Sequence, residues 1–391
     1  MVTAEGAFKT VIESYFETGS EVIQFRDSAG RVLAEDVVSD MDIPPFNRAA
    51  MDGYACKITD IGSELDVIEV IQAGKVPRGI PGKNQCSKIM TGAIVPEGCD
   101  FVFMVEDSKV LPSGKVIFTG KSTKPNLSVK GEDVREGDTV LHRGKLIKPQ
   151  DIAVLSSVGH TMVRVSKRPL VGVVSTGDEL IEPDKKPGLS QIRNSNAYQI
   201  LAQAERAGAT GKYYGIAPDN ENITFNIILR AISENDIVIL TGGVSMGDFD
   251  FVPSVLKNAG VRILFSQIKV QPGRPTTFGV HPEALVFGLP GNPVSSFIQF
   301  EILVRPLINK MMGYDWEPVK WKLPMAVRYE RKSSERMAWI PVNLTGDGKV
   351  KPVEYHGSAH IAAYPYADGI ISIPVGSTFI EKNEVVTVRQ I

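Results

Sequence analysis

With 391 residues, the chain exceeds what a single hydrophobic core usually holds, so we expect two to four domains. Its 43 basic and 45 acidic residues nearly balance, which argues against a nucleic-acid-binding protein that relies on phosphate contacts over a broad surface. Hydrophobic residues make up 43% of the chain but form no run long enough to span a bilayer, so no membrane partner is expected.

The amino terminus and the cysteines indicate the compartment. Residues 1–6 contain no apolar signal core. Cys56, Cys86 and Cys99 are too few and too widely spaced for a disulfide framework or a zinc site. We therefore expect a cytoplasmic protein with reduced thiols.

The first part of the chain predicts a helix and two further units. Apolar residues recur at helical spacing near the amino terminus, which predicts an amphipathic helix that Gly19 closes. Residues 47–139 have the pattern of short strands with frequent turns. We interpret them as a β-rich domain inserted into a discontinuous connecting domain, residues 20–46 and 140–168. Because an insertion leaves two connecting strands of chain, the molecule is expected to be elongated.

Residues 169–315, together with residues 1–19, predict an α/β domain. Uninterrupted β-branched and leucine runs, which suit strands buried on both faces, occur at residues 170–176, 212–217, 236–240 and 284–289. Helical segments separate the first three runs, and this alternation is typical of a doubly wound sheet with right-handed crossovers.

Two segments complete the predicted fold. A helix over residues 294–311 closes the α/β domain, and its first turn would offer backbone N–H groups to an anion. Residues 316–391 alternate as short strands around turns and predict a small C-terminal β domain resembling a barrel. The expected fold class is thus multidomain α/β plus β.

Three strand ends of the doubly wound domain carry acidic residues, and these are Asp178, Glu179, Asp219, Asp248 and Asp250. Ligands of parallel sheets bind at the carboxyl ends of the strands, where carboxylates repel one another and any bound phosphate. A divalent cation removes this conflict, so we predict a Mg²⁺ site formed by Glu179, Asp219 and Asp250. Asp178 and Asp248 are interpreted as helix caps instead.

Glycine-rich turns on the same rim predict an anion-binding crevice. Residues 241–247 (TGGVSMG) and 290–293 (PGNP) allow close backbone approach, because glycine lacks a Cβ atom. Between them in sequence, the proline-rich turn at residues 271–275 carries Arg274, which suits a bidentate contact with an oxyanion. No GxGxxG follows the first strand and no P-loop is present, which argues against a dehydrogenase and a kinase.

Six sequence motifs follow one another over essentially the whole chain. They are PPF with AMDGYA (residues 44–46 and 50–55), MTGA (90–93), STGDEL (175–180), TGGVSMGD (241–248), PGRP (272–275) and LPGNPVS (289–295). Together, and in this order, they resemble the motifs of the molybdopterin molybdenumtransferases, the MoeA and gephyrin E-domain family.

This resemblance implies an elongated four-domain homodimer. Its active site would lie between the doubly wound domain of one subunit and the β-rich domain of the other. The implied reaction inserts molybdate into the dithiolene of adenylylated molybdopterin, with Mg²⁺-dependent cleavage that releases AMP. The expected partners are therefore these small molecules and a second copy of the chain.

The resemblance also implies roles for individual residues. Catalytic roles are expected for Asp52, Thr91 and Asp133, contributed by the second subunit, and for Glu179 and Asp250. The residues expected to hold the nucleotide and the pterin phosphates are Thr176, Gly177, Gly242, Gly243, Ser245, Asp248, Pro290, Gly291, Asn292 and Pro293. The expected oxyanion pocket comprises Gln271, Pro272, Gly273, Arg274, Ser295, Arg336 and Ser358.

Two positions depart from the family pattern. Where the family usually has Lys-Pro-Gly-Lys-Pro, this chain has Gln271 and Arg274, so one cation is lost and another changes type. We hypothesise that this retunes the affinity of the oxyanion pocket or its preference between molybdate and tungstate. Ala49 stands where many relatives have a serine, and we expect little effect because Asp52 is retained.

Three alternative functions are weighed against insertion of molybdate. The doubly wound domain is also similar to molybdopterin adenylyltransferases, but those are usually single domains, and the flanking domains here favour the insertion step. A receptor-clustering scaffold, as in gephyrin-like relatives, would be favoured by a fused domain or a long linker, which the sequence does not contain. A pterin carrier without turnover would not need the acidic residues.

Overall fold

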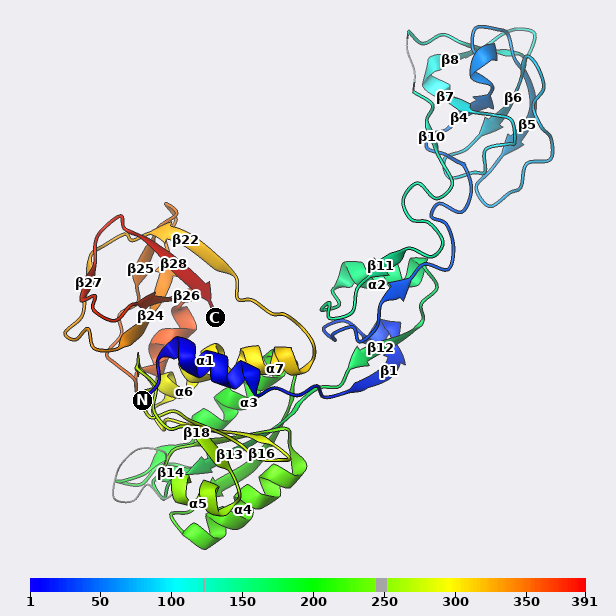
Figure 1. The fold of residues 1–391 in the computed structure, drawn as a ribbon. Helices are drawn as coiled ribbons and strands as arrows, with labels where there is room; N and C mark the ends of the chain where they lie inside the picture. Colours follow the sequence, from blue (N-terminus) through cyan, green and yellow to red (C-terminus); the bar gives the residue numbers. More distant parts are fainter. Residues whose placement is uncertain (122–123, 244–251) are drawn as a thin grey trace.

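The structure is a computed structural model that describes residues 1–121, 124–243 and 252–391. An α/β domain and a C-terminal β domain lie together, and a narrow arm leads from them to a distant β-rich domain (Figure 1). The elongated, multidomain α/β plus β fold class is therefore confirmed. None of the helices in the described ranges is long and apolar enough to cross a membrane.

The α/β domain is built on a six-stranded sheet with the order β16-β13-β17-β21-β20-β18. Its strands are β13 (Leu170–Thr176), β16 (Thr210–Ala217), β17 (Ile237–Thr241), β18 (Arg262–Phe265), β20 (Thr277–Val280) and β21 (Leu285–Leu289). The first four strands in this order are parallel, whereas at one edge β20 pairs antiparallel with β21 and β18 pairs antiparallel with β20.

Both faces of this sheet are buried, as the uninterrupted apolar runs predict. Ile237 and Ile239 of β17 face one hydrophobic cluster, and Val238 and Leu240 face a second cluster on the other side. The helices that cover the sheet are α1 (Ala4–Glu13), α3 (Asn196–Arg206), α4 (Glu221–Glu234), α5 (Val252–Asn258), α6 (Pro293–Gln299) and α7 (Arg305–Met311). Alternate residues of one strand thus pack into two separate hydrophobic clusters, one on each face, as expected for a doubly wound sheet.

Two predicted helices differ in detail from the observed ones. Helix α1 ends at Glu13, and it buries Ala7 and Val11, whereas Phe8 and Phe16 are exposed. The predicted helix over residues 294–311 is continuous but contains a π-helical turn, η4 (Phe300–Val304), between α6 and α7. Such turns often occur at functional sites.

The arm consists of two short antiparallel ladders and one helix. Its elements are β1 (Ser20–Gln24), η1 (Phe25–Asp27), β2 (Val37–Val38), β11 (Thr139–Leu141), α2 (Pro149–Ser157) and β12 (Met162–Ser166). Strand β1 pairs with β12, and β2 pairs with β11. The chain segments before and after the β-rich domain are therefore joined by antiparallel strand pairing. A small hydrophobic cluster around Leu33 and Leu155 stabilises the arm.

The β-rich domain contains a four-stranded sheet with the order β5-β6-β4-β7 and two short ladders, β3-β10 and β8-β9. Its elements are β3 (Arg48–Ala49), β4 (Gly53–Cys56), η2 (Ile58–Asp60), β5 (Asp66–Ile71), β6 (Gln85–Ile89), β7 (Phe101–Met104), η3 (Val105–Asp107), β8 (Ser108–Val110), β9 (Val116–Phe118) and β10 (Leu127–Ser128). All three cysteines are buried free thiols here. Burial raises the pKa of Cys56 and Cys86 to about 12, so both thiols stay protonated and unreactive at neutral pH.

The C-terminal domain contains a six-stranded sheet with the order β19-β24-β26-β28-β22, in which β25 also pairs with β24. Its elements are β19 (Val270–Gln271), β22 (Lys320–Pro324), β23 (Tyr329–Glu330), β24 (Met337–Leu344), β25 (Val350–Pro352), η5 (Ile361–Tyr366), β26 (Gly369–Ile373), β27 (Phe379–Ile380) and β28 (Val385–Gln390). Strand β19 comes from the α/β domain in sequence but pairs in parallel with β24. It therefore carries the turn at residues 271–275 to the junction of the two domains.

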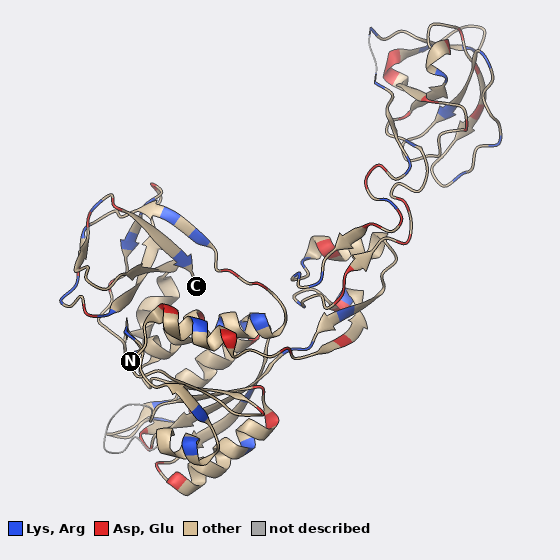
Figure 2. Ribbon diagram, in the orientation of Figure 1, with Lys and Arg blue, Asp and Glu red and all other residues tan. Residues whose placement is uncertain are grey.

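Acidic and basic residues are interspersed along the chain in all four parts of the molecule (Figure 2). This distribution agrees with the near balance of 43 basic and 45 acidic residues.

Candidate functional site

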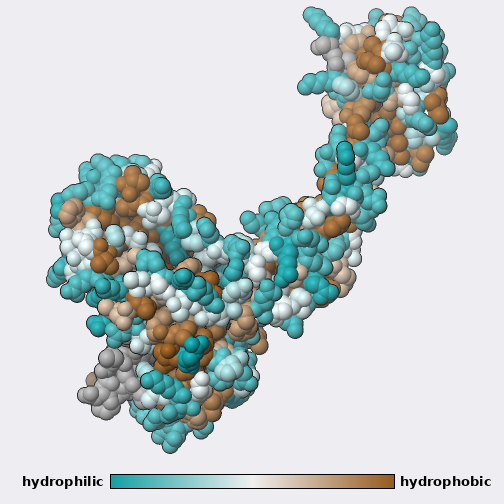
Figure 3. Space-filling model, viewed as in Figure 1, coloured by the Kyte–Doolittle hydropathy of each residue, from teal (hydrophilic) through white to brown (hydrophobic). Residues whose placement is uncertain are grey.

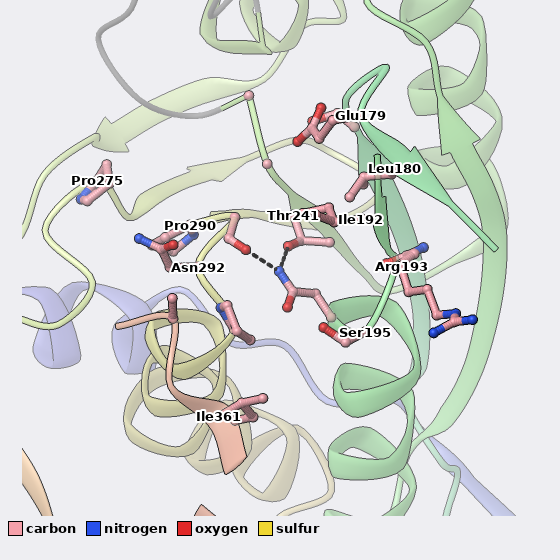
Figure 4. A pocket seen from close by; sticks show the side chains of 18 residues that line it. Glu179, Leu180, Ile192, Arg193, Ser195, Thr241, Pro275, Pro290, Asn292 and Ile361 are labelled. Carbon is pink, nitrogen blue, oxygen red and sulfur yellow. Dashed lines mark hydrogen bonds between the residues drawn. The ribbon is translucent and has the colours of Figure 1, made fainter. Parts of the chain in front are cut away.

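A cavity of about 660 Å³ lies at the carboxyl ends of three parallel strands, β13, β17 and β21 (Figure 4). The strands end in register, because Ser175 lies opposite Thr241 and Thr241 lies opposite Leu289. Their following turns are therefore brought side by side. The residues that line the cavity are Thr176, Glu179, Leu180, Ile192, Arg193, Asn194, Ser195, Asn196, Thr241, Gly242, Gly243, Pro275, Pro290, Gly291, Asn292, Pro293, Ala359 and Ile361.

The turn after β17 makes a closely packed glycine cradle with Thr176. Gly242 and Gly243 have φ values of +96° and +61°, which favour glycine. A Cβ atom at Gly242 would lie 2.5 Å from the Thr176 carbonyl oxygen, and one at Gly243 would lie 2.9 Å from the Thr176 hydroxyl oxygen. That hydroxyl is buried and has no hydrogen-bond partner among the described residues. The predicted anion-binding turn is thus a narrow site with an unpaired hydroxyl group.

Asn196, the first residue of α3, connects two of the turns. Its Nδ2 atom donates hydrogen bonds of 2.8 Å to the Thr241 hydroxyl and of 2.8 Å to the Gly291 carbonyl oxygen (Figure 4). The sequence motifs do not include this residue. The signal available in the sequence was a polar side chain at the start of an amphipathic helix, and such a side chain is usually hydrogen-bonded when it is buried.

The start of α3 is held by Asn194. Its side-chain Oδ1 atom accepts a hydrogen bond of 3.3 Å from the Ala197 N–H. The Asn194 Oδ1 atom also accepts from the Ser175 hydroxyl at 3.1 Å, so this cap is joined to the end of β13. Arg193, immediately before it, lines the cavity and was not predicted as a site residue.

The predicted acidic residues separate in the structure. Glu179 lines the cavity, and its carboxylate lies against Gly177, where an added Cβ atom would be 2.3 Å from Oε2. Asp178 is not a helix cap but accepts a hydrogen bond of 3.0 Å from the Asp219 backbone N–H, which joins two neighbouring turns. Asp219 does not line the cavity. Ser245, Asp248 and Asp250 lie outside the described residues, and within the described ranges no three His, Cys, Asp or Glu side chains form a metal-binding group.

A second cavity, of about 290 Å³, lies at the junction with the C-terminal domain. Pro275, Pro290 and Asn292 line both cavities, so the two adjoin. The predicted oxyanion-pocket residues all line the second cavity, and these are Gln271, Pro272, Gly273, Arg274, Ser295, Arg336 and Ser358. They meet because β19 pairs with β24 across the domain junction.

Hydrogen bonds across this junction hold Ser358 in place. The Asn292 side chain donates to the Ser358 hydroxyl at 3.0 Å, and the Val294 N–H donates to the Ser358 carbonyl oxygen at 3.1 Å. The first turn of α6 therefore uses one of the N–H groups that we expected it to offer to an anion.

The second cavity is rich in arginine. Arg274, Arg331 and Arg336 line it, and none of the three forms an ion pair with a carboxylate in the part of the chain that the structure describes. Three guanidinium groups around a small cavity favour binding of an anion with several oxygen atoms. Arg331 is not among the residues that the sequence motifs predict for the oxyanion pocket.

Gln299, at the end of α6, supports the turn that lines this cavity. It is fully buried, and its Nε2 atom donates a hydrogen bond of 3.1 Å to the Pro272 carbonyl oxygen. Gly273, with φ of +103°, packs so closely that a Cβ atom there would lie 2.3 Å from Nε2. Gln299 is not part of any sequence motif described above, although a glutamine between the apolar residues Ile298 and Phe300 is a signal for a buried polar contact.

The remaining predicted residues lie in the β-rich domain and its connection. Asp52 Oδ1 accepts hydrogen bonds from the Thr91 backbone N–H at 2.6 Å and the Thr91 hydroxyl at 2.8 Å. These bonds, first from the N–H and then from the hydroxyl, lower the pKa of Asp52. Asp133 is exposed in a turn next to Glu132, which closes that turn by accepting from the Val129 N–H. Within one chain, this domain lies far from both cavities (Figure 1).

Three family descriptions match the chain in order. They are "MoeA N-terminal region (domain I and II)" over residues 2–159, "Probable molybdopterin binding domain" over residues 172–310, and "MoeA C-terminal region (domain IV)" over residues 322–391. The fold and the adjoining cavities thus define a modular protein with a domain of the molybdopterin-binding class.

Similar proteins and solved structures cover the full chain. A molybdopterin molybdenumtransferase of Staphylococcus epidermidis is 35% identical and covers 99% of this chain and 95% of its own length. One of Haemophilus influenzae is 33% identical over 100% and 98%. The solved structure of the molybdopterin biosynthesis MoeA protein from Pyrococcus horikoshii OT3 superimposes with a TM-score of 0.87 at 30% identity over all of both chains. The chain belongs to the molybdopterin molybdenumtransferase family, the MoeA family.

Proposed function

We propose that this protein catalyses the insertion of molybdate into adenylylated molybdopterin, with release of AMP, in molybdenum cofactor biosynthesis. One observation carries the proposal most directly. An arginine-lined cavity opens beside a glycine cradle at the strand ends, and the two share Pro275, Pro290 and Asn292. A dianionic oxyanion and a phosphate-bearing substrate could therefore bind next to each other.

The residues of this chain would perform two tasks. In the larger cavity, Gly242 and Gly243 let phosphate oxygens approach the backbone, and the Thr176 hydroxyl is available to donate a hydrogen bond. In the smaller cavity, the arginines and Ser295 lower the repulsion between molybdate and the phosphoanhydride. This arrangement favours a reaction between two anions that would otherwise repel each other.

The proposal includes Mg²⁺, and Glu179 is the described residue that fits such a site best. Its carboxylate lines the larger cavity near the glycine cradle (Figure 4), and carboxylate oxygen is the ligand type that Mg²⁺ prefers. Asp219 and Asp250 remain predicted ligands. When bound, Mg²⁺ offsets negative charge on the phosphate oxygens.

We also propose a homodimer with shared active sites. Asp52 and Thr91 adjoin β4 and β6 of the β-rich domain, and Asp133 lies between β10 of that domain and β11 of the arm. Because the β-rich domain is distant from the α/β domain (Figure 1), a second copy of the chain would have to bring these residues to the cavities. The β-rich domain also exposes apolar side chains that a partner could cover, including Val70, Val76 and Ile80, and Figure 3 shows apolar surface on this domain. The domain boundaries and the cytoplasmic location given above remain part of this proposal.

Release of AMP from adenylylated molybdopterin, measured with Mg²⁺ in the presence and absence of molybdate, tests the proposed reaction. We expect release that depends on molybdate. Formation of adenylylated molybdopterin from ATP would instead support an adenylyltransferase. Tight binding of the pterin without any release would support a carrier or scaffold.

Replacing Gly242 with alanine should weaken AMP binding by about tenfold or more, because the added methyl group occupies the cradle and the backbone conformation becomes strained. Isothermal titration with AMP measures this. Gly215→Ala is the matched control, since Gly215 has a φ of +89° but nothing within 4 Å of its added Cβ atom. Equal AMP affinities of the two variants would show that the cradle is not the nucleotide site.

A further inference from the structure

The oxyanion pocket contains an arginine that the family motifs do not explain. Resting on the function proposed above, we propose that Arg331 is an oxyanion-binding residue, and that it supplies the positive charge which the pocket lacks because Gln271 replaces a lysine. Both side chains line the same cavity, together with Arg274 and Arg336. The cavity therefore has three arginine side chains, although the turn at residues 271–275 has one cation fewer than the family pattern.

The backbone of the C-terminal domain orients the Arg331 side chain. Its Nε, Nη1 and Nη2 atoms donate hydrogen bonds of 2.7 Å each, to the carbonyl oxygens of Ser377, Arg336 and Pro374 respectively. A guanidinium group has five N–H donors, so two remain for a ligand. The bond to the Arg336 carbonyl oxygen also joins this arginine to the second one in the pocket.

The charge of Arg331 is not neutralised by a neighbouring carboxylate in the described ranges. Carbonyl oxygens carry only partial charge, and the side chain is half-buried, so burial lowers the pKa of Arg331. A partly buried cation without a counterion is costly unless an anion binds beside it. The arrangement is what an anion-binding pocket requires.

Arg328, three residues earlier, shows the contrasting case. Its Nη2 atom lies 2.7 Å from a carboxylate oxygen of Glu330, and its Nη1 atom lies 3.0 Å from one of Glu381. Its guanidinium also stacks on the Phe379 ring. Arg328 is thus a paired surface cation that does not line the cavity, and it serves as a matched control.

Equilibrium binding of molybdate to the full-length protein tests the inference. We expect Arg331→Gln to weaken binding by about 10- to 100-fold, since a hydrogen bond to a charged group is lost. Arg328→Gln should bind molybdate as the wild type does. Thermal unfolding of each variant is measured alongside, because loss of the three carbonyl contacts could also loosen the domain.

A rescue variant separates charge from structural support. Gln271→Lys in the Arg331→Gln background restores a cation but none of the three carbonyl bonds, so recovery of molybdate binding would support the inference. Weak binding without recovery would overturn it in favour of a structural role. Wild-type affinity of Arg331→Gln, with weakened binding by Arg336→Gln, would overturn it and leave the proposed function intact. Unchanged binding by both variants would instead refute the oxyanion pocket itself.

Discussion

Replacing Asp52 with alanine is expected to lower molybdate-dependent AMP release by about 100-fold or more, the usual contribution of a positioned acid or base. The Asp52 carboxylate is held by the Thr91 N–H at 2.6 Å and by its hydroxyl at 2.8 Å, and both bonds favour the charged form. Single-turnover measurements with adenylylated molybdopterin would detect the loss. Glu132→Gln is the control, because the hydrogen bonds of the Glu132 carboxylate, from Val129 and Ser128, lie within its own turn.

Mixed dimers would show whether this carboxylate acts across subunits. Asp52→Ala removes the predicted catalytic carboxylate from the β-rich domain. Glu179→Gln removes the carboxylate charge from the larger cavity. If one site uses both chains, random exchange of two inactive variants gives heterodimers that each contain one intact site, which restores about a quarter of wild-type activity. No recovery, despite exchange shown by differently tagged chains, would place the complete site within one chain.

Replacing Glu301 with alanine is expected to lower the free energy of unfolding by about 3–5 kcal/mol, because it leaves the largely buried guanidinium of Arg305 without its carboxylate partner. Glu301 is fully buried in the π-helical turn. It pairs with Arg206, lies 3.0 Å from Arg305 Nη1, and accepts a hydrogen bond of 2.7 Å from Gln203. These partners come from α3 and α7, so the carboxylate joins helices on one face of the sheet.

The π-helical turn and its arginine partners also contact the C-terminal domain and the segment that leads to it. Arg389 of β28 donates to the Glu301 carbonyl oxygen, and Arg305 stacks 4.4 Å from the centre of the Trp316 ring. Urea unfolding can be followed by fluorescence, since all three tryptophans lie at or after residue 316. Glu13→Ala, which removes an exposed pair with Lys9, should leave the unfolding free energy nearly unchanged. A similarly small change for Glu301→Ala would contradict the proposed importance of the buried charges.

Much of the fold was predictable because it depends on local patterns. The apolar runs of β13, β17 and β21 predict strands buried on both faces, and the two hydrophobic clusters confirm it. The glycines at 242 and 243 were predicted to allow close approach, and both have positive φ and pack on Thr176. The family motifs indicated the oxyanion-pocket residues, which all line one cavity.

Only the tertiary structure decided which distant residues meet. Strand β19 pairs with β24, which places Val270 opposite Met337 although the two are far apart in the sequence, and this pairing creates the arginine-lined cavity. The contacts of Asn196 with Gly291, of Gln299 with Pro272 and of Arg331 with Pro374 likewise join separate segments. Hydropathy and glycine patterns indicate the conformation of residues that are close in sequence. Contacts between residues far apart in sequence depend instead on how the formed strands and helices pack together, and no local sequence pattern specifies this packing.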